Sequence, residues 1–258
     1  MKNVMDDHKS FDGYWTMVKR FALWSSSKAS LKFRLARFFE GVTFDGKSML
    51  DIGGGTGWIS LFGACMGAKS VVCLEPEVDG SRRGALNKLE NVCGSLPGHL
   101  RIIPKAVRFQ EFDPGNETFD IVVSHGSINH LDEEACINLQ HSADARARYS
   151  AIFQKLSELT SPGGKLIIVD CSRNNFWHQI GLTNPFAPTI EWHKHQAPEF
   201  WSNMLSDFGF VSPRIRWDSF GRLGRIGNLL LGHRVGAYFG RSNFILVMDR
   251  RREAAENP

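Results

Sequence analysis

The sequence lacks the cysteine pattern of a disulfide scaffold or of a zinc site. Its five cysteines are odd in number and widely spread, and no two of them form a CxxC pair. Such thiols are typical of a protein kept reduced in a cytoplasm. The chain also lacks an apolar stretch of the roughly 18 residues that a spanning helix needs, and the N-terminal MKNVMDDHKS holds no apolar signal core. We therefore expect a cytoplasmic protein that is neither secreted nor transmembrane.

Acidic residues are missing from one long stretch near the N-terminus. Residues 18–39 contain six basic residues and no acid, and residues 213–252 contain nine arginines against two aspartates. Solvated faces explain most such runs, and an anionic partner is the alternative. The sequence also lacks internal repeats and low-complexity tracts. Its 258 residues, 42% of them hydrophobic, indicate one α/β domain with additions.

Short β-branched runs alternate with longer helical segments, which is typical of a parallel sheet built from βαβ units. We expect an N-terminal helical cap (1–46) and a Rossmann-like domain (47–258). Within that domain, residues 171–200 and 218–241 are predicted to be substrate-binding insertions. The predicted strands are 48–52, 70–75, 100–105, 119–125, 165–170, 211–217 and 243–249, and the predicted helices between the first five strands are 57–67, 80–93, 132–141 and 144–160.

A glycine-rich loop, DIGGGTG, follows the first predicted strand and opens a helix. Without Cβ atoms, its backbone can approach a nucleotide-type ligand closely. The spacing is GxGxG (Gly53, Gly55, Gly57) rather than the GxGxxG of dinucleotide sites, and Asp51 would repel a pyrophosphate but suit an ammonium or a sulfonium. Glu75 ends the next strand, where a carboxylate can accept both hydroxyls of a ribose. These residues favour S-adenosylmethionine over a nicotinamide cofactor.

Four segments resemble motifs of the class I S-adenosylmethionine-dependent methyltransferases: LDIGGGTG, CLEPE, FDIVVSHGSINHLDE and TSPGGKLIIVD. They stand in the family's order, and the resemblance covers the chain from the first predicted strand to the last. It implies a Rossmann-like, mostly parallel sheet of seven strands whose last strand is inserted antiparallel. It also implies a cofactor site at the carboxyl ends of the first strands, formed by Asp51, Gly53, Gly54, Gly55, Gly57, Glu75, Pro76, Ala106, Val107, Ser124 and His125.

The residues after the fourth predicted strand bear on the acceptor. Family members that methylate adenine or glutamine nitrogen carry Asn or Asp followed by Pro-Pro-Tyr there, whereas this chain reads SHGSIN. The Asp-Asn pair of metal-dependent relatives is also missing, so we expect no metal. We expect methyl transfer to an oxygen of a small molecule, such as a sugar or a specialised metabolite. Alternatives are a lipid-linked or nucleic-acid acceptor, and a protein that binds the cofactor without catalysis.

His130, with His125 five residues before it, is the expected general base, because a hydroxyl acceptor must lose its proton as the methyl group moves. The alternative is that His130 only caps or packs against the next helix. Further acceptor-binding residues are expected in the cap, after the fourth strand and in the insertion after the fifth strand: Tyr14, Trp15, Asn129, Arg173, Asn174, Glu191, His193 and His195.

The segment GRLGRIGNLLLGHRVGAYFGR (221–241) is too polar to span a bilayer, but its arginines and apolar residues could lie on one. Ordinary helices covering the sheet are the alternative. The basic, aromatic cap would also suit RNA, although no segment resembles an RNA-binding module. We therefore expect a small-molecule acceptor as the partner, with peripheral membrane contact and the oligomeric state left open.

Overall fold

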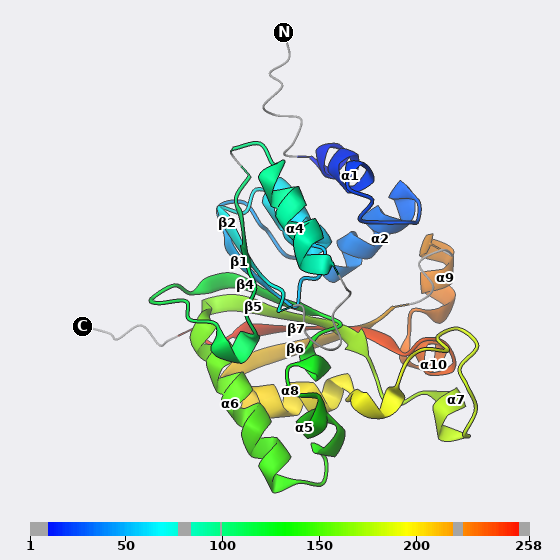
Figure 1. Cartoon of the computed structure of the whole chain (residues 1–258). Coiled ribbons are helices and arrows are strands. Elements are labelled where there is room, and N and C mark those ends of the chain that lie inside the picture. The colour runs from blue at the N-terminus through cyan, green and yellow to red at the C-terminus, as the bar shows by residue number, and fades with distance from the viewer. Residues whose placement is uncertain (1–9, 77–83, 99, 219–223, 253–258) are drawn as a thin grey trace. The chain divides into compact units, whose positions relative to one another are not determined.

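The computed structural model describes residues 10–76, 84–98, 100–218 and 224–252 (Figure 1). Its strands are β1 (Ser48–Ile52), β2 (Ser70–Leu74), β3 (Ile102–Lys105), β4 (Phe119–His125), β5 (Thr160–Cys171), β6 (Phe210–Trp217) and β7 (Asn243–Arg250). They form one sheet in the order β3-β2-β1-β4-β5-β7-β6. The pairs β1–β2, β1–β4 and β2–β3 are parallel, and β7 runs antiparallel to β5 and β6. The expected Rossmann-like sheet with an antiparallel last strand is confirmed.

Burial explains why the strands could be recognised from their apolar runs. All five residues of β1 and four of the five residues of β2 are buried, so both strands read as continuous hydrophobic stretches. The start of β5 differs from the expectation. The strand begins at Thr160 rather than at Lys165, although its pairing with β7 covers only Lys165–Cys171.

The helices agree with the predicted rhythm, with the residues before 84 in the second predicted helix lying outside the described residues. Ser10, Ser27 and Ser142 cap α1, α2 and α6, each accepting a hydrogen bond from a backbone N–H of the first turn. The α-helices are α1 (Phe11–Arg20), α2 (Lys28–Phe38), α3 (Trp58–Cys65), α4 (Ala85–Gly94), α5 (Glu133–Asn138), α6 (Ala143–Leu159), α7 (Phe176–Gln179), α8 (Pro198–Ser206), α9 (Gly224–Leu231) and α10 (Arg234–Phe239). Short 3₁₀ turns are η1 (Phe109–Glu111), η2 (Ile128–His130) and η3 (Trp192–Lys194).

The chain divides into two compact units. The first comprises Met1–Asp113 and Ile121–His125, and the second comprises Pro114–Asp120 and Gly126–Pro258. The helices expected to form a cap therefore belong to the same unit as the first strands. The division at residue 46 and the two insertions stay predictions, and residues 219–223 of the second insertion lie outside the described residues.

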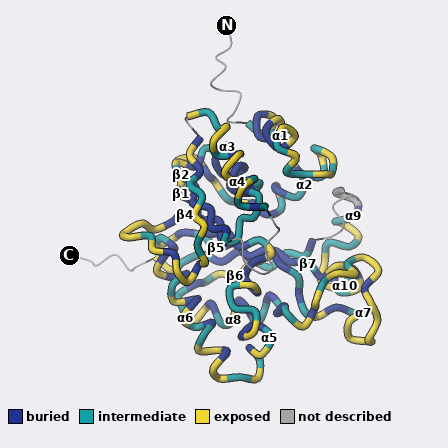
Figure 2. Tube along the Cα trace, in the orientation of Figure 1, coloured by how far each residue is buried: buried dark blue, intermediate teal, exposed yellow. Residues whose placement is uncertain are grey.

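Each unit has its own buried interior (Figure 2), which contains large apolar side chains. In the first unit, α1 packs on α3, and Tyr14 and Val18 are fully buried. In the second unit, α6 packs on β5, and α8 packs on β6 and β7. Trp201 of α8 lies 5.3 Å from Tyr149 and 5.8 Å from Phe153, measured between ring centroids.

Candidate functional site

The register of the parallel strands brings the expected cofactor residues to one edge of the first unit. The last residue of β1 pairs with the last residue of β2 and with Ser124 of β4, and the last residue of β3 pairs with that of β2. Gly53, Glu75 and Ala106 directly follow β1, β2 and β3, and His125 ends β4. The carboxyl edge of an open α/β sheet is where such folds bind ligands.

The glycine loop has two separate reasons for its composition. Gly53, Gly55 and Gly57 have φ values of +66°, +57° and +78°, a left-handed region that other residues rarely adopt. A Cβ on Gly54 would collide with the Cys73 sulfur, whereas no described atom lies within 4 Å of the place where a Cβ on Gly55 would stand. The loop is therefore closely packed underneath and open beside Gly55, as a ligand lying against its backbone requires.

Asp51 lies under this loop and is fully buried. Ser60 donates a hydrogen bond of 2.6 Å to its Oδ2, and its Oδ1 has no hydrogen-bond partner among the described residues. Burial raises the pKa of this carboxyl group to about 6; hydrogen bonds from Ser60 oppose the rise and the charge of Glu75 adds to it. A buried carboxylate of this kind is stabilised by a nearby cation, and S-adenosylmethionine carries a sulfonium and an ammonium.

Glu75 is buried as well and touches the loop directly. Its Oε2 accepts a hydrogen bond of 2.8 Å from the backbone N–H of Gly55, and its own N–H donates to the carbonyl of Lys105 at 3.0 Å. The carboxylate is thus held next to the open side of the glycine loop. This placement fits the ribose-binding role that the sequence suggests for it.

The other expected cofactor residues follow the same strands. Pro76 and Val107 are half-buried, Ala106 is exposed, and Ser124 is buried inside β4. The accessible apolar side chains after β3 suit contact with an adenine ring. Ser124 would support the carboxyl edge of the sheet from inside β4.

Aromatic rings gather where the glycine loop enters α3. Trp58, the first residue of α3, has its ring centroid 5.4 Å from that of His125, 5.2 Å from that of Trp24 and 6.3 Å from that of Phe38. His125 also lies 5.4 Å from Phe38. His125 is thus packed among aromatic rings, and the cofactor-binding and catalytic roles expected of it stay predictions. Trp58 was not among the site residues expected from the sequence, although it directly follows Gly57, the last glycine of the loop.

Tyr14 and Trp15, the expected acceptor contacts of the cap, have different surroundings. Tyr14 is fully buried, its ring lies edge-on to Phe62 at 5.3 Å, and its hydroxyl donates a hydrogen bond of 3.2 Å to the carbonyl of Trp58. Burial raises the pKa of Tyr14. Trp15 is half-buried, with the Lys19 ammonium 5.9 Å from its ring centroid. Tyr14 therefore anchors α1 on the helix after the glycine loop, and Trp15 is the more accessible of the two.

In the second unit, His130 belongs to a chain of ion pairs. Its Nδ1 lies 2.9 Å from Glu133, and the same carboxylate receives the Lys194 ammonium at 2.7 Å. Lys194 first, and His130 after it, hold the pKa of Glu133 below its usual value. Lys194 also pairs with Glu191 at 2.8 Å, so two expected residues, His130 and Glu191, share one network. The neighbouring Asn129 is buried, and its Oδ1 has no partner among the described residues.

A second histidine–carboxylate pair lies at the end of β5. His195 Nδ1 is 3.1 Å from Asp170 Oδ1, and both side chains are buried. The same oxygen accepts a hydrogen bond of 2.7 Å from the Cys171 N–H, whereas Asp170 Oδ2 has no partner among the described residues. Because Nδ1 faces the carboxylate, it acts as the donor, and Nε2 is the nitrogen left to accept a proton. Sequence reasoning named His195 but missed Asp170, for which the signal was a carboxylate at the end of the fifth strand.

Arg173 contacts the buried side-chain amide of Gln196, the residue that follows His195. The Gln196 Oε1 accepts hydrogen bonds from Arg173 at 3.2 Å and from Gln140 at 2.8 Å, and its Nε2 donates to the carbonyl of Cys136 at 2.6 Å. His193, by contrast, is exposed on η3. Of the two histidines in HKH, only His195 is thus buried beside these polar side chains.

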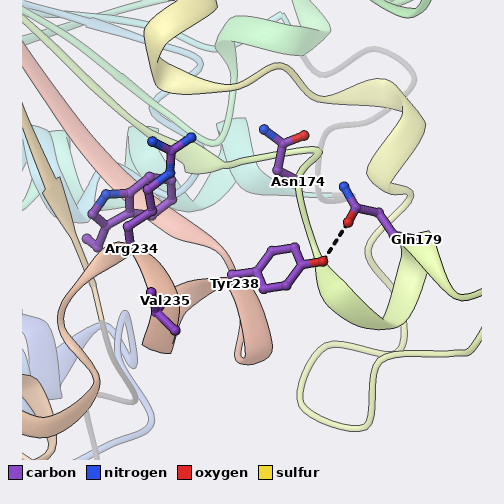
Figure 3. Close-up of a pocket in the computed structure, with 6 residues that line it drawn as sticks. Asn174, Gln179, Arg234, Val235 and Tyr238 are labelled. Carbon is purple, nitrogen blue, oxygen red and sulfur yellow. Dashed lines mark hydrogen bonds between the residues drawn. The ribbon is translucent and has the colours of Figure 1, made fainter.

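Asn174 lies at a pocket of about 390 Å³ in the second unit (Figure 3). The Tyr238 hydroxyl donates a hydrogen bond of 2.6 Å to Gln179 Oε1 across one side of the pocket. The pocket thus combines aromatic rings, amides, one aliphatic side chain and one cation. Its lining residues are Asn174, Gln179, Trp217, Arg234, Val235 and Tyr238.

No group of three or more His, Cys, Asp or Glu side chains among the described residues could hold a metal ion. Among the helices that the structure describes, none combines the length and the apolar content that a membrane crossing requires.

Comparisons with known proteins agree with this geometry. A family model described as a methyltransferase domain matches residues 23–212. No curated protein sequence matches the chain.

Solved structures share the fold at low sequence identity. A SAM-dependent methyltransferase from Aquifex aeolicus is 13% identical with a TM-score of 0.57, and the match covers 91% of this chain and 98% of that one. One from Methanosarcina mazei is 18% identical with a TM-score of 0.52, covering 85% and 98%. The phosphoethanolamine N-methyltransferase 2 of Haemonchus contortus, in complex with phosphomonomethylethanolamine and S-adenosylhomocysteine, is 15% identical with a TM-score of 0.58, covering 95% and 58%.

Proposed function

Because this chain belongs to the methyltransferase domain family, we propose that it transfers a methyl group from S-adenosylmethionine to a hydroxyl oxygen of a small molecule. Methyl transfer and its donor follow from the family. The oxygen acceptor and its small size are the proposal, and the buried His195–Asp170 pair is the observation that carries it. The expected cytoplasmic location remains part of the same proposal.

The first unit would hold the donor. When bound, S-adenosylmethionine supplies a methyl carbon made electrophilic by its sulfonium. The loop from Gly53 to Gly57 would carry the methionine part, with Asp51 beneath it as the complementary negative charge. Glu75 would accept the ribose hydroxyls, and Ala106 and Val107 would border the adenine.

Histidine chemistry supports a hydroxyl acceptor. Such an acceptor must lose a proton as its oxygen bonds to the methyl carbon and the carbon–sulfur bond breaks. His195 would take that proton at Nε2, while Asp170 stabilises the resulting imidazolium through Nδ1. A neutral amine can attack through its lone pair without prior proton removal, so a buried histidine–carboxylate pair has its clearest use with a hydroxyl.

His130 is the second candidate for the base, because Glu133 would support its charged form in the same way. The two pairs differ in exposure. The side chains of His130 and Glu133 are each 38% exposed, against 11% for His195 and 2% for Asp170. Water screens the exposed pair more strongly, so the electrostatic interaction between Asp170 and His195 is stronger than that between Glu133 and His130. We therefore place the base at His195.

The experiment uses S-adenosylmethionine labelled with ¹³C in its methyl group, together with panels of hydroxylated small molecules and their amine counterparts. Mass spectrometry detects the products, and the carbon chemical shift separates a methoxy group from an N-methyl group. We expect methoxy products from the wild type, and their loss in His195→Ala with unchanged affinity for S-adenosylhomocysteine. Labelled methyl groups found only on nitrogen would overturn the proposal.

A further inference from the structure

The exposed large hydrophobic side chains are concentrated in one part of the second unit. All those in the described residues belong to two segments, 176–190 and 227–242, which we call the apolar face. Leu229, Leu230 and Val235 are 81%, 65% and 60% exposed. Isolated exposed hydrophobic residues are ordinary, but a concentrated set marks an interaction surface. Its other members are Ile180, Leu182, Phe186 and Phe239.

The two segments contact each other through α7 and α10, which lie side by side (Figure 1). The rings of Phe176 and Phe239 lie 4.8 Å apart, and the Trp177 indole N–H donates a hydrogen bond of 2.8 Å to the carbonyl of Phe239. Arg241 Nε donates to the carbonyl of Phe186 at 2.9 Å. These contacts join α7 and the loop after it to the end of α10.

The charges of the apolar face have one sign. Neither segment contains an acidic residue. Arg234 is exposed, and its pairing with Glu199 is loose, at 3.7 Å. Arg241 is also exposed. A two-fold contact between copies of this chain would collect arginines and no carboxylate from these segments in one interface, so the face does not complement itself electrostatically. Apolar side chains with arginines among them match the interface of an anionic lipid layer instead.

The pocket of Figure 3 opens in the same part of the molecule. Four of its lining residues also belong to the apolar face: Gln179, Arg234, Val235 and Tyr238. Trp217 and Tyr238 contribute rings. Tyrosine and tryptophan commonly lie at the level of lipid headgroups, because one end of the ring is apolar and the other is polar. The pocket volume of about 390 Å³ lies within the range of small-ligand sites.

We propose that the apolar face docks on an anionic lipid surface and that the pocket receives an anionic headgroup beside Arg234. Leucine and valine side chains enter the acyl boundary, and the arginines stay with the headgroups. The inference goes beyond methyl transfer and does not depend on which atom is methylated. It gives the chain a place of action at a membrane surface through peripheral contact.

The test is sedimentation of the full chain with vesicles of phosphatidylcholine alone and of phosphatidylcholine mixed with phosphatidylglycerol. We expect binding to the anionic vesicles only. Leu229→Ser/Leu230→Ser should lower the partition coefficient at least about tenfold, because two exposed apolar side chains no longer enter the lipid. Arg234→Gln should lower it about fivefold. Lys69→Gln, which removes one exposed charge of the first unit, is the matched control and should change it little.

Folding and competing partners are checked in parallel. Each variant should keep the S-adenosylhomocysteine affinity of the wild type, which also separates this test from that of the proposed function. Equal binding to both vesicle types, or to neither, would overturn the proposal. So would loss of binding in Lys19→Gln/Arg20→Gln with retention in the leucine variant. A concentration-dependent dimer that the leucine variant abolishes would assign the face to a second copy, and tighter binding of a single-stranded oligonucleotide than of vesicles would assign it to nucleic acid.

Discussion

Asp51→Asn tests the buried carboxylate under the glycine loop. The pKa of Asp51 is about 6 in the folded chain against 3.8 for an ordinary aspartate, and a difference of this size corresponds to about 3 kcal/mol. The folded state holds the proton more tightly than the unfolded state does, so ionised Asp51 destabilises the fold. This penalty is absent below pH 3.8, grows as the pH rises towards 6, and is complete above it. Asparagine cannot ionise and escapes the penalty.

The assay is urea denaturation of both chains at about pH 4.5 and pH 7.5. Between these values, the free energy of unfolding of Asp51→Asn should gain about 2 kcal/mol relative to the wild type. Comparing the two chains at each pH cancels the titration of the other groups. The difference at a single pH is less informative, because the asparagine amide can leave an unpaired donor where Oδ1 now lies. A difference that does not change with pH would refute the raised pKa.

The same substitution should have the opposite effect on the ligand. Removing the negative charge beneath the loop should weaken S-adenosylhomocysteine binding by about 1–3 kcal/mol, measured by calorimetry at pH 7.5. A variant that gains stability relative to the wild type as the pH rises, while it loses affinity, would show that the buried charge serves binding at a cost to the fold. Undiminished affinity would mean that Asp51 only shapes the loop.

The remaining predictions concern the ribose, the cap and the base. Glu75→Ala should weaken S-adenosylhomocysteine binding by about 1–3 kcal/mol in calorimetry, because the ribose hydroxyls lose their acceptor. Tight NADH binding without a response to S-adenosylhomocysteine would contradict the cofactor assignment. Tyr14→Phe removes only the hydroxyl that bonds the Trp58 carbonyl, so denaturation should show a loss of about 1 kcal/mol, and an unchanged curve would leave that bond without a role. With the acceptor at saturation, His195→Ala should lower kcat by roughly 10²-fold or more and His130→Ala by less; the reverse ranking would return the base to His130.

Local sequence features were enough to predict most of the fold. β1 and β4 have the predicted bounds, because a parallel strand that is buried along all or most of its length reads as an apolar run. The antiparallel position of β7 followed from the family resemblance rather than from its own residues. The start of β5 was missed because Pro162 and two glycines are typical of a turn. Gly163 does have a left-handed φ of +76°, although the strand already begins at Thr160.

The sequence by itself predicted the residues that we propose bind the donor. Asp51, the glycine loop and Glu75 are tied to the ends of neighbouring parallel strands, and strand register aligns such ends whatever packs around them. Only the tertiary structure decided that His195 meets Asp170, 25 residues away, that Tyr14 is buried against Phe62, and that α7 joins α10. These contacts join elements whose distance and rotation depend on the packing of whole side-chain layers, which no local pattern encodes.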